Sequence, residues 1–169
     1  MFTTIKDFVD QFTTERANTL KIFGALADES LGQNVAHDHR TLGRLAWHIT
    51  LMYVEGAMTR PAGLNITGAK EDSTPPKTAA EIREVYDNVS RQFLDQIKEN
   101  WTDASLQEER DFFGTRWRMG FMLEVILRHE IHHRGQMTVL MRQAGLKVPG
   151  VYGPAYEEWK NFGAEPPKV

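Results

Sequence analysis

An uninterrupted helical pattern from Phe121 to Arg142 constrains the fold of this 169-residue chain more than any other stretch. The stretch contains no proline, and its apolar residues recur every three or four positions, as on the buried face of a helix. We therefore predict one amphipathic helix of about six turns. Its single glycine, Gly135, costs up to about 1 kcal/mol relative to alanine, which indicates close packing against a neighbouring helix or chain at that point.

Two histidines of this predicted helix, His129 and His133, stand one turn apart. A projection at about 100° per residue places both on the apolar stripe together with Gln136, and it places Glu130 and Arg134 at or beyond the margin of that stripe. Two buried imidazoles are costly unless something binds their lone pairs, and a metal ion does so. Core histidines hydrogen-bonded to neighbouring side chains are the competing explanation, which the paired spacing disfavours.

Three further helical patterns precede this one, and each begins at a threonine that can cap a helix. A short hairpin or turn is expected within residues 101–117, and a short helix at residues 155–162. No segment alternates with the period of a strand. These patterns predict an all-α four-helix bundle with long crossover loops, such as residues 60–77, in a single domain spanning residues 1–169. The three further helices and their caps are residues 4–26 (Thr3 or Thr4), 41–58 (Thr41) and 78–100 (Thr78).

His48 is the third histidine expected to face inward. It lies on an apolar stripe of the predicted helix 41–58, and Glu55 stands two turns along the same face. Sites in helix bundles form from side chains on facing helices. We therefore predict a metal site made by His48, His129 and His133.

The chain has no cysteine, so any metal must use nitrogen and oxygen ligands. Three imidazoles suit a first-row divalent ion and leave a coordination position open for water or substrate. Zinc fits this ligand set best, and nickel, iron and manganese remain alternatives. Glu55 and Gln136 share the faces of the predicted ligands and could orient a ligand or a bound water.

Residues 129–133, His-Glu-Ile-His-His, also match H-E-x-x-H, the zinc-peptidase helix in which the glutamate is the general base. Against this alternative, Gly135 stands one residue too early for the extended motif, and Val139 occupies the position of its third histidine. No edge strand is apparent to hold a peptide. A peptidase is therefore a minor alternative.

The other three histidines have weaker claims to a metal. His132 lies toward the edge of the stripe, which favours a hydrogen-bonding or interface role. His37 and His39 fall in a polar loop and are expected at the solvated surface.

The net charge of −3 offers no broad basic surface, so we expect no nucleic-acid partner. No apolar stretch approaches membrane-spanning length and the N-terminus does not resemble a signal peptide, so we expect a cytoplasmic protein without membrane association.

The segment Leu45-Ala-Trp-His48-Ile, followed by His129-Glu-Ile-His-His133-Arg-Gly-Gln136, resembles the DinB-like proteins, which are grouped with YfiT-like metal-dependent hydrolases and thiol-dependent transferases and isomerases. The resemblance covers essentially the whole chain. It implies an up-down-down-up bundle, often a homodimer, with a metal held by His48, His129 and His133. Members include thiol S-transferases, a mycothiol-dependent isomerase and proteins of unknown activity, so the family does not fix the reaction.

Two functions follow from these observations. The first is a metal-dependent enzyme, of hydrolase or thiol S-transferase type, that activates water or a low-molecular-weight thiol at the open position. A basic mouth for such a substrate could come from Arg40, Arg44, Arg60 or Lys70. The second is a non-catalytic metal-binding or stress-response protein whose site is structural.

Overall fold

The computed structural model describes residues 1–168, and five α-helices account for most of the regular structure in that range. Three short 3-10 helices and one two-stranded antiparallel sheet complete it. The elements are α1 (Ile5–Phe23), η1 (Asp28–Ser30), α2 (Leu42–Leu51), α3 (Gly56–Thr59), α4 (Ala79–Asn100), η2 (Ser105–Gln107), β1 (Glu109–Phe112), β2 (Thr115–Arg118), α5 (Met119–Gln143) and η3 (Tyr156–Phe162).

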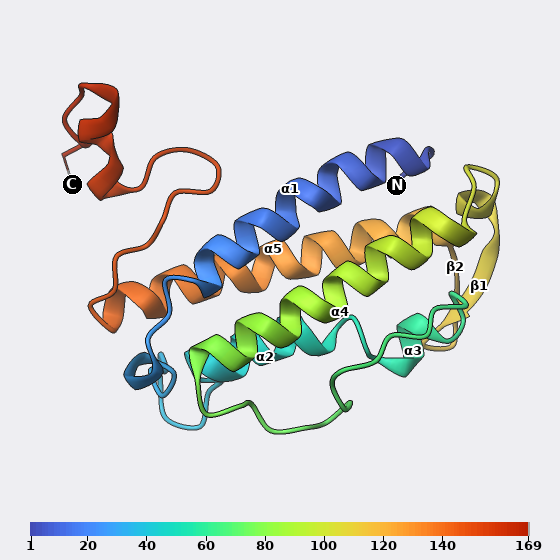
Figure 1. Ribbon diagram of the computed structural model, residues 1–169, viewed down its shortest axis with the longest axis horizontal. Helices are drawn as coiled ribbons and strands as arrows, with labels where there is room; N and C mark the ends of the chain where they lie inside the picture. The colour runs from blue at the N-terminus through green and yellow to red at the C-terminus, as the bar shows by residue number, and fades with distance from the viewer. Residues whose placement is uncertain (169) are drawn as a thin grey trace.

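The four long elements α1, α2, α4 and α5 form a bundle in which each helix packs against two others. Figure 1 shows α1 and α5 running in one direction and α2 and α4 in the other, which is the up-down-down-up order. The parallel pair α2 and α4 requires the long connection through residues 60–78. The predicted all-α four-helix bundle is confirmed.

Three threonines start the helices as the sequence predicted. The side-chain oxygens of Thr4, Thr41 and Thr78 each accept a hydrogen bond from the backbone N–H three residues further on, at 3.1–3.2 Å. The Thr78 hydroxyl also donates to the carboxylate of Glu81 at 2.8 Å. These bonds satisfy backbone donors that would otherwise lack partners in the first turn.

The second helix is shorter than predicted. It ends at Leu51, and the extended backbone of Glu55 (φ −62°, ψ 115°) separates it from the single turn of α3. The apolar pattern continues through this break because Met52, Tyr53 and Met58 are all buried. The apolar pattern of the sequence therefore placed the end of the predicted helix too late. Gly56, a poor helix former, directly follows the interruption.

The hairpin expected before the last helix is present. Strand β1 pairs with β2 from Glu109–Arg118 to Phe112–Thr115. The two turn residues Phe113 and Gly114 both have positive φ, 55° and 76°, as the tightest hairpin turns require.

Aromatic rings fill the core between the helices. Phe12, Tyr53 and Phe93 are fully buried, and their ring centroids lie 5.2–5.9 Å apart. Edge-on and tilted aromatic contacts of this kind add to the free energy gained from burial. Within residues 1–168, none of the helices combines the length and apolar character needed to span a membrane.

Two glycines of α5 give a matched test of helix packing. Gly135 does not pack closely against a neighbouring helix, one of the two partners that the sequence led us to expect, because a Cβ there would find no atom of the described chain within 4 Å beyond the adjoining residues of α5. We expect Gly135→Ala to raise the free energy of unfolding by about 0.5–1 kcal/mol. Gly120→Ala should lower it, because the added Cβ would collide with the carbonyl oxygen of Phe2. Denaturant unfolding measures both, and a destabilised Gly135→Ala monomer would contradict this account.

Candidate metal centre

The three predicted ligands come together between α2 and α5. The Nε2 atom of His129 lies 3.0 Å from Nε2 of His48 and 3.0 Å from Nε2 of His133. Within residues 1–168, these three residues form the group of potential ligands whose donor atoms all lie within 4.8 Å of one another. His133 is buried, His48 is half-buried and His129 is exposed, so the cluster sits where the bundle interior meets the surface.

The spacing and chemistry of these nitrogens fit a divalent metal. Zinc lies about 2.0–2.1 Å from imidazole nitrogen, so two ligand nitrogens on one ion stand roughly 2.8–3.4 Å apart at angles between about 90° and the tetrahedral value. Nδ1 of His133 lies 2.7 Å from Oε1 of Gln136, an acceptor, which places the proton on Nδ1 and leaves a lone pair on Nε2. That lone pair is directed at the cluster. The three histidines could therefore hold one metal ion.

Gln136 orients two histidines at once. Its Oε1 accepts the hydrogen bond from His133, and its Nε2 donates to Nε2 of His132 at 3.1 Å. Partners of this kind fix the tautomer and ring orientation of a metal ligand. Gln136 thus contacts one of the predicted ligands, and His132 makes a hydrogen bond, which is one of the two roles, hydrogen bonding or interface, that the sequence favoured.

Glu55 reaches the site by a different route from the one predicted. It does not continue the helical face of His48, because α2 ends at Leu51. Instead it lines a cavity of about 110 Å³ together with His129 and Phe113 from the hairpin tip. Burial raises the pKa of the Glu55 carboxyl, and the charges of Glu71 and Asp72 raise it further.

The environment keeps all three imidazoles neutral. Burial lowers the pKa of His48 from 6.5 to about 4, and the positive charge of Arg40 adds to the effect. Burial also lowers the pKa values of His129 and His133, and neighbouring charges lower them further, although the hydrogen bond to Gln136 opposes the shift at His133. A metal ligand must be neutral imidazole, so these shifts leave the nitrogen lone pairs available near pH 7.

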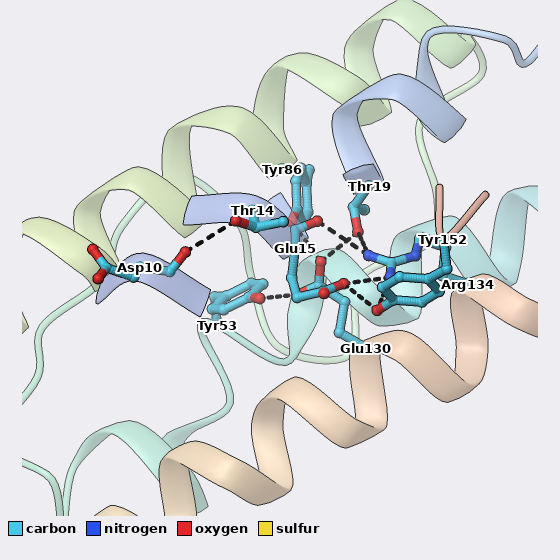
Figure 2. Close-up of polar contacts among 9 residues, drawn as sticks. All are labelled: Asp10, Thr14, Glu15, Thr19, Tyr53, Tyr86, Glu130, Arg134 and Tyr152. Carbon is cyan, nitrogen blue, oxygen red and sulfur yellow. Dashed lines mark hydrogen bonds and ion pairs between the residues drawn. The ribbon is translucent and has the colours of Figure 1, made fainter. Parts of the chain in front are cut away.

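Glu130 corrects the sequence interpretation. We expected it at or beyond the margin of the buried stripe, but its side chain is fully buried. Figure 2 shows its carboxylate among three hydroxyl groups: Thr19 and Tyr86 donate to Oε1, the latter at 2.7 Å, and Tyr53 donates to Oε2. Each partner comes from a different part of the bundle. Burial, then the charge of Glu130, raises the pKa of both tyrosines well above the ordinary value.

Arg134 is the second residue whose expected position was wrong, since only 2% of its surface is exposed. Its guanidinium donates to the carbonyl oxygen of Glu15 at 3.1 Å, to the hydroxyl of Thr19 at 3.0 Å and to the carboxylate of Glu15. The hydroxyl of Tyr152, in the C-terminal segment, lies 2.8 Å from the same guanidinium. Thr19 therefore connects the Arg134–Glu15 ion pair to the Glu130 cluster, which consists of Glu130, Thr19, Tyr53 and Tyr86.

The buried position of Glu130 removes the main support for a peptidase. In the H-E-x-x-H arrangement the glutamate must reach a water at the metal. Here its two oxygens accept hydrogen bonds from three core hydroxyls. The literal motif is thus a helix with two site histidines and a structural glutamate between them.

Of the remaining histidines and basic residues, some lie near the histidine cluster and others do not. His37 is exposed and contacts Asp38, whereas His39 and Arg40 line a larger cavity that reaches His133. Neither His37 nor His39 belongs to the ligand cluster in the described chain. Of the basic residues proposed for a mouth, Arg44 donates to the carbonyl of Ser73.

Comparison with known proteins identifies the family of the chain. The model of the DinB family matches residues 1–168. The chain belongs to the DinB family. The uncharacterized protein YrdA of Bacillus subtilis is 43% identical to this DinB-family chain over all 169 residues, and the match covers the whole of both proteins.

Two solved structures of DinB-like proteins resemble the fold. That of a DinB-like protein from Bacillus cereus has 42% identity and a TM-score of 0.84, covering 90% of this chain and all of the other. That of the DinB-like protein YjoA from Bacillus subtilis has 20% identity and a TM-score of 0.67, covering 86% of this chain and 97% of the other, and it supports the fold alone.

The Glu130 cluster predicts a large effect on stability from a small change. Glu130→Gln replaces a carboxylate oxygen with an amide NH₂ group that cannot accept a hydroxyl hydrogen bond, so we expect a loss of about 2–4 kcal/mol in the free energy of unfolding. Tyr86→Phe removes one donor and should cost less, about 1–2 kcal/mol. Denaturant unfolding of the metal-free proteins measures both. A Glu130→Gln variant as stable as the natural protein would show that the cluster does not hold the fold.

The lowered pKa of His48 predicts acid sensitivity. An unfolded His48 titrates at its ordinary pKa of 6.5, and the folded one at about 4. Between these values the unfolded state binds more protons, so the stability contributed by the neutral folded form is lost as the pH falls through this window. Denaturant unfolding of metal-free protein at about pH 7 and about pH 5 should show a smaller loss for His48→Gln than for the natural chain. Equal losses would contradict the assignment.

Proposed function

We propose that this DinB-family protein is a metal-dependent enzyme that acts on a small molecule at the three-histidine site, as a hydrolase or a thiol S-transferase. The main observation behind the proposal is that, among the described residues, three potential metal ligands, and not four, converge at the site. Three imidazole nitrogens approach one another, and within residues 1–168 no carboxylate or fourth imidazole joins the group. Catalytic sites keep such an open position, whereas structural zinc sites are closed by a fourth protein ligand.

The side chains around the cluster support this function in distinct ways. His48, His129 and His133 supply neutral nitrogens, and Gln136 fixes the orientation of His133. A bound metal, for which zinc is our first choice, would lower the pKa of water or of a thiol at the open position.

Glu55 is the acidic group that we assign to proton transfer. It shares a cavity with His129. Burial raises the pKa of its carboxyl, which brings the group closer to the range useful for a general base near neutral pH. In this proposal the Glu55 carboxylate accepts the proton of the attacking water or thiol. The apolar side chains of Met52 and Met58 beside it limit the access of other water.

Metal binding is the first test. Protein purified without a metal-binding tag, then stripped and titrated with zinc, should bind one equivalent as measured by elemental analysis. His129→Ala and His133→Ala should lose this binding, and Gln136→Leu should weaken it about 10–100-fold. His132→Ala is the matched control, because it removes a neighbouring imidazole outside the cluster. Full zinc occupancy in both His129→Ala and His133→Ala would sink the site assignment.

Catalysis is the second test. X-ray absorption of the zinc protein should show three imidazole nitrogens and an oxygen that exchanges with added thiol. Glu55→Gln should keep its zinc and lower the rate with hydrolysable or thiol substrates by about 10²–10⁴-fold. A coordination shell closed by four protein ligands, with no turnover of either substrate class, would instead favour a non-catalytic metal-binding protein.

A further inference from the structure

A second and larger cavity meets the histidine cluster on the side away from Glu55. It has a volume of about 530 Å³ and reaches His133 and Gln136. Cavities of about 300–1,000 Å³ hold small organic molecules. The two cavities touch different ligands, since the smaller one is lined by His129. A molecule in the larger cavity would therefore approach the cluster from the direction of His133.

The walls of this cavity are mainly apolar. Leu45 of α2 and Val139 and Leu140 of α5 line it, and Val35 faces them from the loop before α2. Val35 and Val139 are exposed, with 62% and 55% of their surface accessible. Exposed aliphatic side chains that converge on one cavity favour a ligand with an apolar body.

Arg40 supplies a positive charge at the same cavity. Within the described chain its guanidinium makes no hydrogen bond or ion pair, whereas Arg44 donates to the carbonyl of Ser73 and Arg60 lies 4.0 Å from the carboxylate of Glu71. A guanidinium presents five N–H donors and pairs well with planar carboxylates and with phosphates. Arg40 is thus free to bind an anionic group of a ligand.

The local charge balance favours an anion. Among the described residues that line this cavity, Asp38 is the acidic one, and it is exposed and contacts His37 at 2.8 Å. The Asp38 carboxylate thus has a partner of its own, whereas the Arg40 guanidinium has none within the described chain, so Arg40 is the charged group of this cavity that remains to pair with a ligand. Positive clefts with apolar walls concentrate anions.

We propose that the substrate of this site is an amphiphilic anion, whose apolar body lies against Leu45, Val139 and Leu140 and whose carboxylate or phosphate pairs with Arg40. The position of its reactive atom at the histidines rests on the proposed function. Its binding does not, because Arg40 and the apolar walls belong to the chain itself. Arg40 is then a specificity-determining residue.

The test compares three ligands of one chain length: hexanoate, hexyl phosphate and the neutral hexanamide. Calorimetry is done on metal-free protein and on zinc-loaded protein, with zinc content measured in every sample. We expect at least one of the two anions to bind about tenfold or more tightly than hexanamide in both forms. The anion that is preferred identifies the head group as a carboxylate or a phosphate.

Variants of exposed residues make the test specific. Arg40→Gln should reduce the preference for the anion to about twofold or less without changing zinc content, and Val139→Glu should abolish anion binding. Arg60→Gln is the matched control and should keep the preference. The proposal is overturned if hexanamide binds as well as both anions, if none of the three binds, or if Arg40→Gln keeps the preference. A protein that prefers the anion but takes up no zinc would refute the proposed function and leave the anion site intact.

Discussion

The buried carboxylate of Glu130 holds the bundle together at one point. It joins α5 to α1 through Thr19, to α4 through Tyr86 and to the turn after α2 through Tyr53. Burying a carboxylate without such donors would be very costly, so the four segments must meet in one arrangement for all three bonds to form. Because successive side chains of a helix differ by about 100°, anchoring Glu130 in the core also sets the direction of His129 toward α2. The stability of the core and the orientation of the site histidine His129 therefore depend on the same residue, Glu130.

The sequence predicted the features that depend on local pattern. The helix caps follow from threonines at fixed offsets, and the histidine cluster follows from two residues one turn apart plus one on a second amphipathic helix. The burial of Glu130 and Arg134 could not be found in this way. A helical projection assumes one apolar face, whereas α5 also packs polar groups against α1, whose partner residue Thr19 lies more than a hundred positions away. The end of α2 was missed because buried residues continue past the break.

The site is asymmetric, and the asymmetry is chemical. Glu55 and His129 line a small cavity with mainly apolar walls, and Arg40 and His133 line a larger one. The proposed proton acceptor and the proposed anion-binding group would thus be separated by the histidines, which suits a reaction in which one molecule is held and a second, smaller one is activated. Membership of the DinB family does not fix the reaction. The two cavities limit the size and charge of the molecules that could reach the histidines.

The separation of His48 and His129 along the chain also affects when the site can form during synthesis. His48 precedes His129 by 81 residues, so a ribosome adding about 5–20 residues per second completes α2 roughly 4–16 s before it reaches the second imidazole. Until α5 emerges, α2 lacks one of the two helices against which it packs, and one imidazole alone cannot compete for a metal ion. The three nitrogens converge only after α5 has been synthesised and has packed against α2. Any metal would thus be chosen from the ions available to a chain that already contains α5, and its binding would favour the folded state by mass action.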